Sequence, residues 1–165
     1  MVPVQAAVSR ARWAEIGLTL PAPLAEADRV SQAVSMSSSP IADYGLLSDC
    51  RSAALVSAAG SVDWLCLPRF DSPSVFGRLL GDDAGFWSIR PVADFTSTRR
   101  YVGPSMVLET FFRTDEGEVT LTDALALGNG NRGHDLGAGS PGALLRQVSC
   151  IRGTVQLDVV FVARP

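Results

Sequence analysis

The chain has 165 residues, of which 47% are hydrophobic and 19% charged, and its net charge at pH 7 is −3. This composition is typical of one globular domain and excludes a chain that is disordered throughout. The negative net charge, with arginines in pairs and not in patches, excludes a nucleic-acid-binding protein.

The sequence also argues against a membrane or secreted protein. No apolar run approaches the ~20 residues of a membrane span, and Glu15 interrupts the apolar part of the first twenty residues, so no secretory signal is predicted. Cys50, Cys66 and Cys150 are widely spaced and form no CxxC motif, which favours reduced thiols. We therefore expect a cytoplasmic protein.

Residues 1–39 differ from the rest of the chain. They are rich in alanine, serine and proline, Pro21 and Pro23 interrupt any helix, and residues 35–40 read SMSSSP, as in a linker. We predict a flexible N-terminal extension over 1–39 and a folded domain over 40–165. Whether Met36 is the natural start stays open.

From Ile41 onward the pattern predicts short strands separated by turn signals. Three hairpins are expected, around Gly60, around residues 114–117 and around Arg152–Gly153, and Gly103–Pro104 marks a further turn. The fold class is therefore mostly β, an antiparallel β-sandwich of the supersandwich kind. The predicted strands are 53–57, 61–67, 86–90, 95–102, 106–113, 118–125, 144–151 and 154–162.

One short helix is expected between the second and third of these strands. Ser72 matches an N-cap, Pro73 a first helical position, and Gly81 a stop, so the spacing predicts a helix over Ser72–Leu80.

Alternation within the strands assigns the core. In 154–162, Val159 and Phe161 share one face with other apolar residues, so this face is expected to be buried. In 144–151 the pattern is weaker, because Arg146 falls on the apolar face. The aromatic residues expected in the core are Trp87, Phe111, Phe112 and Phe161.

A long Gly-rich loop is predicted between 118–125 and 144–151. Gly128–Gly133 matches GxGxxG, but the Gly- and Pro-rich residues after it exclude the helix that a dinucleotide site needs. His134, next to Asp135, has no second histidine or cysteine near it, so we favour a solvated side chain over a metal ligand. No cofactor and no metal are expected.

Enzymatic hydrolysis of a glycosidic bond needs two carboxylates about 5–9.5 Å apart, one acting as acid and the other as base or nucleophile. The candidates are Asp63, Asp71, Glu109 and Asp123. For Asp71 we favour a role in capping the predicted helix, and for Asp63 hydrogen bonds to backbone amides at a strand edge. Contact of either residue with a sugar stays open.

The residues Trp64, Arg69, Phe70 and Asp71 are the substrate-binding candidates. An aromatic ring can stack on a sugar, while a guanidinium and a carboxylate hydrogen-bond its hydroxyl groups. The same rings also suit a domain interface. We identify no catalytic residue.

The run DWLCLPRFDSPSVF, from Asp63 to Phe76, resembles the amino-terminal domain of bacterial trehalase-like and glucoamylase-like enzymes of glycoside hydrolase family fifteen. Further segments agree in order: Ile41–Gly45, Arg99–Tyr101, Leu108–Thr110 and Ser140–Leu145. The resemblance implies a β-sandwich packed on an α/α-barrel that carries two catalytic glutamates and hydrolyses α-glucosidic bonds.

The sequence departs from that family because no helical barrel follows the last predicted strand. The resemblance therefore implies an accessory domain, inactive alone, whose partner is an α/α-barrel catalytic domain in cis or in trans and whose ligand is an α-glucoside. The alternative is a stand-alone carbohydrate-binding or protein-interaction module.

Overall fold

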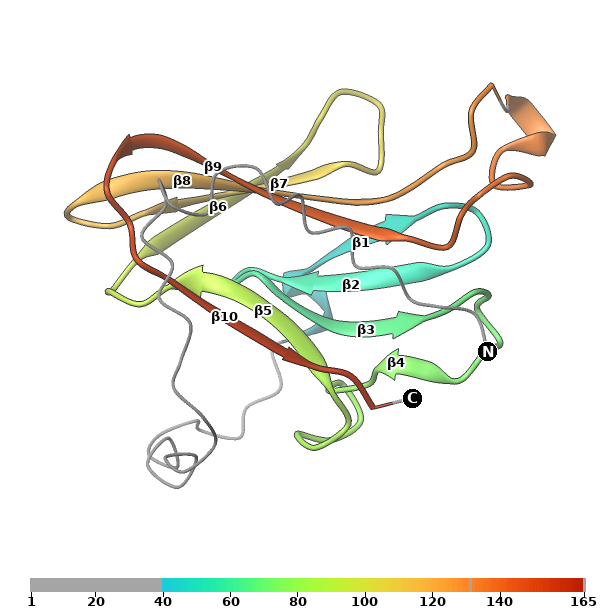
Figure 1. The fold of residues 1–165 in the computed structure, drawn as a ribbon, viewed down its shortest axis with the longest axis horizontal. Coiled ribbons are helices and arrows are strands. Elements are labelled where there is room, and N and C mark those ends of the chain that lie inside the picture. Colours follow the sequence, from blue (N-terminus) through green and yellow to red (C-terminus); the bar gives the residue numbers. More distant parts are fainter. Residues whose placement is uncertain (1–39, 131, 165) are drawn as a thin grey trace.

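The computed structural model describes residues 40–130 and 132–164, which form two stacked antiparallel sheets (Figure 1). The predicted β-sandwich is confirmed. The extension predicted over 1–39 lies outside the described residues. Within the described part of the chain the helices are two three-residue 3₁₀ turns, η3 (Ile41–Asp43) and η4 (Gly133–Asp135).

The first sheet, sheet A, has six strands and the second, sheet B, has four. Sheet A runs β1-β2-β3-β5-β10, with β4 paired to the end of β3, and sheet B runs β6-β7-β8-β9. The strands of sheet A are β1 (Tyr44–Ser48), β2 (Ala53–Ser57), β3 (Ser61–Cys66), β4 (Ser74–Phe76), β5 (Phe86–Pro91) and β10 (Leu157–Val162). Those of sheet B are β6 (Thr96–Tyr101), β7 (Leu108–Arg113), β8 (Gly117–Leu125) and β9 (Leu144–Gly153).

The hairpin between β2 and β3 follows from its turn residues. Gly60 has φ +77°, and a Cβ there would collide with the carbonyl oxygen of Ile89. Only glycine satisfies both conditions. The prediction of this hairpin, with β2 at its predicted bounds, is confirmed.

The helix predicted over Ser72–Leu80 is wrong. Residues Ser74–Phe76 form β4, where Phe76 pairs with Leu65 and is 2% exposed. The Ser72 hydroxyl accepts a hydrogen bond from the backbone N–H of Arg69, upstream of it, instead of capping a following helix. Pairing with β3 buries an apolar ring, which outweighs the local helix signal.

The hairpin predicted between 144–151 and 154–162 is also wrong. β9 pairs with β8 in sheet B, whereas β10 pairs with β5 in sheet A. The chain crosses from one sheet to the other after Gly153, so these consecutive strands lie on the same side of the sandwich (Figure 1).

The core between the sheets consists of two apolar clusters. Trp87 of β5 packs against both clusters and joins them. The larger cluster contains Leu47, Ala54, Val56, Val62, Leu65, Phe76, Leu108, Leu125 and Leu144. The smaller contains Ile89, Phe112, Val119, Leu121 and Val155.

Three loops meet at one end of this sandwich. They are the β1–β2 turn, the β3–β4 loop over residues 67–73, and the Gly-rich β8–β9 loop over residues 126–143, which lie together on the right of Figure 1. This end of the molecule carries three of the four predicted site residues.

Candidate functional site

The buried carboxylate of Asp49 organises the three-loop end. One of its oxygens accepts hydrogen bonds from the backbone N–H of Arg51 at 3.0 Å and of Ser52 at 2.7 Å. Its other oxygen accepts a hydrogen bond from the hydroxyl of Ser140 in the Gly-rich loop. Asp49 is fully buried, so these hydrogen bonds compensate the loss of water around its charge. The β1–β2 turn and the Gly-rich loop are thereby held together.

Close backbone contact fixes the same two loops. Gly137 has φ +87°, and a Cβ there would collide with the carbonyl oxygen of Asp49. A glycine is therefore required for the Gly-rich loop to lie directly on the turn.

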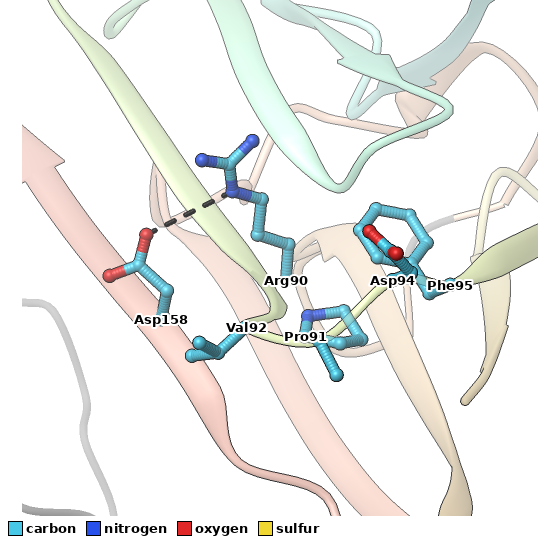
Figure 2. A pocket seen from close by; sticks show the side chains of 7 residues that line it. Arg90, Pro91, Val92, Asp94, Phe95 and Asp158 are labelled. Atoms are coloured by element: carbon cyan, nitrogen blue, oxygen red, sulfur yellow. Dashed lines mark ion pairs between the residues drawn. The ribbon is translucent and has the colours of Figure 1, made fainter. Parts of the chain in front are cut away.

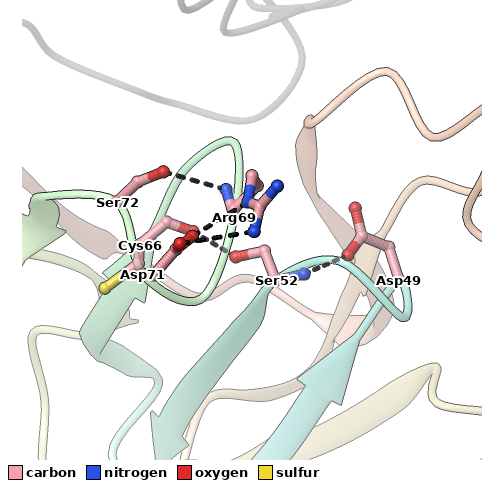
Figure 3. A network of polar contacts seen from close by, with 6 residues as sticks. All are labelled: Asp49, Ser52, Cys66, Arg69, Asp71 and Ser72. Atoms are coloured by element: carbon pink, nitrogen blue, oxygen red, sulfur yellow. Dashed lines mark hydrogen bonds and ion pairs between the residues drawn. The ribbon is translucent and has the colours of Figure 1, made fainter.

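The β3–β4 loop is tied to the same turn. The Ser52 hydroxyl donates to the carbonyl oxygen of Cys66, and the N–H of Phe70 donates to the carbonyl oxygen of Arg51 at 2.9 Å. Figure 3 shows Ser52 between Asp49 on one side and the β3–β4 loop on the other. The Leu67–Pro68 peptide bond in this loop is cis.

An open pocket of about 440 Å³ lies between the turn and the loop. Phe70, one of the lining residues, is 59% exposed and therefore accessible to a ligand. The lining residues are Cys50, Arg51, Arg69, Phe70 and Asp71. An aromatic ring, two guanidinium groups and a carboxylate therefore surround one depression.

Arg69 and Asp71 form a two-point ion pair at the pocket. The Arg69 Nε lies 2.9 Å from Asp71 Oδ1, and Nη2 lies 3.3 Å from Oδ2 (Figure 3). The hydrogen bonds from Arg69 hold the pKa of Asp71 below its ordinary value. Both side chains are largely exposed, so the pair orients the two groups and contributes little to stability.

Trp64 lies apart from the other three predicted site residues. It is in β3, opposite Leu55 of β2, on the outer face of sheet A, because its neighbour Leu65 points into the core. It does not line the pocket. Arg69, Phe70 and Asp71 therefore line one pocket, whereas the strand that continues to Cys66 places Trp64 outside it.

The sequence did not indicate Cys50 and Arg51 as pocket residues. The turn that presents them lies after β1, a strand the pattern did not predict. A usable signal was the spacing of Asp49 and Ser52, because an aspartate that bonds backbone N–H groups two and three residues on is typical of a tight turn.

Asp63 and Asp71, the two carboxylates at the ends of the segment 63–71, have partners other than those expected. Asp63 is buried and accepts a hydrogen bond from Tyr44 Oη at 2.9 Å and another from the Ser61 hydroxyl, instead of bonding strand-edge amides. Asp71 pairs with Arg69 and caps no helix. The expected roles of both are corrected accordingly.

The remaining acid candidates are paired as well. Glu109 Oε2 lies 2.8 Å from Arg100 Nη2, and Asp123 lies within the core beside Arg146. The residues that line the 440 Å³ pocket include a single acid, Asp71. This pocket therefore lacks the second carboxylate that glycoside hydrolysis requires.

A second depression, of about 560 Å³, lies at the β5–β6 connection. Figure 2 shows Arg90 facing Asp158 across the β5–β10 pair, with 3.9 Å between Nε and Oδ2. Pro91, Val92, Ala93, Asp94 and Phe95 complete its lining. It contains none of the predicted site residues.

The described residues hold no metal site and no membrane helix. Over 40–130 and 132–164, no three His, Cys, Asp or Glu side chains gather as a metal ion requires. His134 lies in η4, whose three residues are exposed. No helix in this part of the chain has the length and apolar character needed to cross a membrane.

The chain matches one family model and several curated proteins. The trehalase-like N-terminal family model matches residues 28–165. The chain is 44% identical over 131 residues to a trehalase of Mycolicibacterium smegmatis and 42% identical over 131 residues to one of Mycobacterium tuberculosis, matches that cover 72% of the chain and 19% of either trehalase. It is 50% identical over 70 residues to trehalase 1 of Sulfolobus acidocaldarius, covering 42% of the chain and 12% of that protein. No solved structure matches the chain.

Proposed function

The chain belongs to the trehalase-like N-terminal family, and from that premise we propose that it is the accessory β-sandwich domain of a glycoside hydrolase. The enzyme acts on α-glucosidic bonds in carbohydrate metabolism, and its catalytic carboxylates lie on an α/α-barrel domain of the glucoamylase-like kind. That domain is joined in the same polypeptide or binds as a separate chain.

The extent of the match carries this proposal. The family model covers residues 28–165, whereas the chain spans about a fifth of the length of the two mycobacterial trehalases that it matches. Four fifths of each trehalase, which includes ample length for a catalytic domain, therefore lies outside the matched part.

The pairing of the acids supports the same proposal. Asp63, Asp71, Glu109 and Asp123 each have a partner of their own within the domain. None of them lies beside a second free carboxylate in the pocket described above. These four acids therefore form no acid and base pair at this pocket for a glycosidic bond.

We assign the three-loop end the role of bordering a substrate cleft. Arg69, Phe70 and Asp71 would contact the outer part of an α-glucoside, while bond cleavage takes place on the partner domain. We further propose a cytoplasmic location, since the three cysteines form no disulfide in the structure.

Turnover assays on trehalose and maltose test the accessory role. The isolated chain is expected to hydrolyse neither sugar. Clear hydrolysis by the isolated chain that is lost in Asp71→Asn would overturn the proposal, because it would place a catalytic acid in this domain.

The alternative function is a stand-alone carbohydrate-binding module, and the half-exposed Phe70 ring in its pocket favours it. Titration with maltooligosaccharides separates the two. A stand-alone module binds sugar saturably and loses that binding in Phe70→Ala but keeps it in Trp64→Ala, since Trp64 lies outside the pocket. A docking domain shows no saturable binding alone.

A further inference from the structure

The two sides of the sandwich differ in how their edge strands are covered. On the side of β1 and β6, the Tyr101 hydroxyl accepts a hydrogen bond from the N–H of Leu46 at 2.9 Å and donates one to its carbonyl oxygen at 3.0 Å. Arg99 Nη1 also donates to the carbonyl oxygen of Val56, across the sheets, at 3.1 Å. Side chains of sheet B therefore close this side over the free edge of β1.

The opposite side, formed by β9 and β10, is open. Among residues 40–130 and 132–164, β10 pairs with β5 alone and β9 with β8 alone, so each has one edge without a partner strand. The unpaired N–H and C=O groups of such an edge can bind another strand. Both open edges lie on the same side of the sandwich, as Figure 1 shows.

Burial changes abruptly between β5 and β10. Ile89 of β5 is 7% exposed, whereas its neighbour Val159 of β10, on the same inner face, is 49% exposed. Trp87 is partly buried, whereas its neighbour Phe161 is 50% exposed and offers an apolar ring to solvent. Phe161 was expected in the core, and only half of it is covered.

Sheet B shows the same change at one pair near the end of the β8–β9 ladder. Val119 is 3% exposed, whereas Cys150, its partner across the ladder, is exposed. Val159, Phe161 and Cys150 therefore face inward without being covered, whereas Leu144 and Arg146, nearer the start of β9, are buried. Apolar residues in inward-facing positions are normally buried.

β10 also lacks the devices that protect a natural edge strand. Its sequence, LDVVFV, contains no proline and no lysine, and its one charged side chain, Asp158, faces Arg90 of the neighbouring strand at 3.9 Å. Exposed edges of this kind are otherwise blocked by charges, prolines or bulges. The strand is therefore suited to accept a further strand.

We propose that the β9–β10 side is the docking surface for the catalytic polypeptide, which adds an extended strand to the edge of β10 and covers Val159 and Phe161 with apolar side chains. This inference rests on the proposed accessory function. The length of the relatives points to this occupant, because the matched part is 19% of the Mycolicibacterium smegmatis trehalase and the remainder supplies the strand. Strand addition uses backbone hydrogen bonds for affinity and alternate side chains for specificity.

The experiment compares hydrogen exchange in the isolated chain and in a chimera. In the chimera, the chain replaces the matched segment of the Mycolicibacterium smegmatis trehalase. Peptides that cover β10 and the end of β9 are expected to exchange at least about tenfold more slowly in the chimera. Peptides that cover β2, a central strand, are expected to exchange at the same rate in both.

A pair of matched substitutions tests the surface itself. Val159→Lys places a charge on the open side and is expected to restore rapid exchange of β10 in the chimera. Val92→Lys makes the same change at a valine that is 59% exposed on the β5–β6 connection, and is expected to leave exchange of β10 slow.

The outcomes separate the inference from the function on which it rests. An active chimera whose β10 exchanges as fast as in the isolated chain, or in which the two lysine variants behave alike, overturns the docking surface alone. A folded chimera without trehalose hydrolysis overturns the accessory function, and the inference with it. Should the chimera not fold, exchange in the isolated chain decides: β10 protected as well as β1 means that the side is not open, and the inference fails.

Discussion

Arg146 of β9 and Asp123 of β8 form an ion pair with both side chains fully buried, and 2.8 Å separates Nε from Oδ1. The same guanidinium donates to the carbonyl oxygens of Trp87 at 2.6 Å and Gly60 at 2.7 Å, both in or next to sheet A, and lies over the Trp87 ring at 5.2 Å. One side chain of sheet B therefore fastens the two sheets together. This explains why an arginine interrupts the apolar face of β9.

Removing one partner of the Arg146–Asp123 pair is expected to lower the free energy of unfolding. Burial raises the pKa of Asp123, and the charge and hydrogen bonds of Arg146 oppose that rise. Arg146→Met leaves the acid buried without its cation, so the free energy of unfolding should fall by about 3–5 kcal/mol. Urea denaturation measures this change.

The double variant Arg146→Met with Asp123→Leu is the control for this pair. It removes both charges, so it should unfold at a higher urea concentration than Arg146→Met alone. An Arg146→Met variant within about 1 kcal/mol of the parent chain would contradict the role of the pair.

The turn at Gly60 predicts a second stability difference. Gly60→Ala introduces a Cβ where φ is +77° and where that atom would collide with the Ile89 carbonyl oxygen. Gly103→Ala introduces one at φ +53°, in open space. Thermal unfolding should show a loss of more than about 1 kcal/mol for Gly60→Ala and a smaller one for Gly103→Ala. Equal losses of stability in the two variants would mean that the collision with the Ile89 carbonyl oxygen does not lower the free energy of unfolding.

The ion pair at the pocket predicts a pH effect. The folded-state pKa of Asp71 lies below the ordinary value of 3.8, so its stabilising contribution is present above pH 3.8 and is lost as pH falls through the folded-state pKa. NMR titration of the Asp71 carboxyl carbon should give a pKa below 3.8. In Arg69→Gln the pKa of Asp71 should return toward 3.8. An unchanged pKa would show that Arg69 is not the group that lowers it.

The cysteines predict a labelling pattern. Cys50 and Cys150 are exposed, whereas Cys66 is buried and burial raises the pKa of its thiol. Fewer thiolate ions and less access both slow its reaction. Ellman's reagent should therefore titrate two thiols quickly in the folded chain and a third only in urea. Rapid reaction of all three would contradict the burial of Cys66.

Local sequence signals predicted much of the fold, because strands and turns depend on near neighbours. The two short runs 53–57 and 61–67 and the glycine between them were sufficient for the β2–β3 hairpin. The segment Ser72–Leu80 was misassigned because a favourable N-cap competes with a long-range pairing that burial of Phe76 decides. The sequence of Ser72–Leu80 alone does not reveal that Ser74–Phe76 pairs with β3.

The candidate site was predictable only in part for the same reason. Arg69, Phe70 and Asp71 are adjacent in sequence, so a loop brings them together. Arg51 reaches the pocket through a hydrogen-bonded contact between Arg51 and Phe70, nineteen residues apart. Such contacts between loops depend on how the strands pair and the sheets pack. Local sequence patterns do not predict them.

Trehalose hydrolysis, measured side by side for the isolated chain and for its chimera with the Mycolicibacterium smegmatis trehalase, decides whether the chain is an accessory domain. An accessory domain predicts no hydrolysis by the isolated chain and clear hydrolysis by the chimera. Hydrolysis by the isolated chain, or a folded chimera that leaves trehalose intact, would contradict the accessory role.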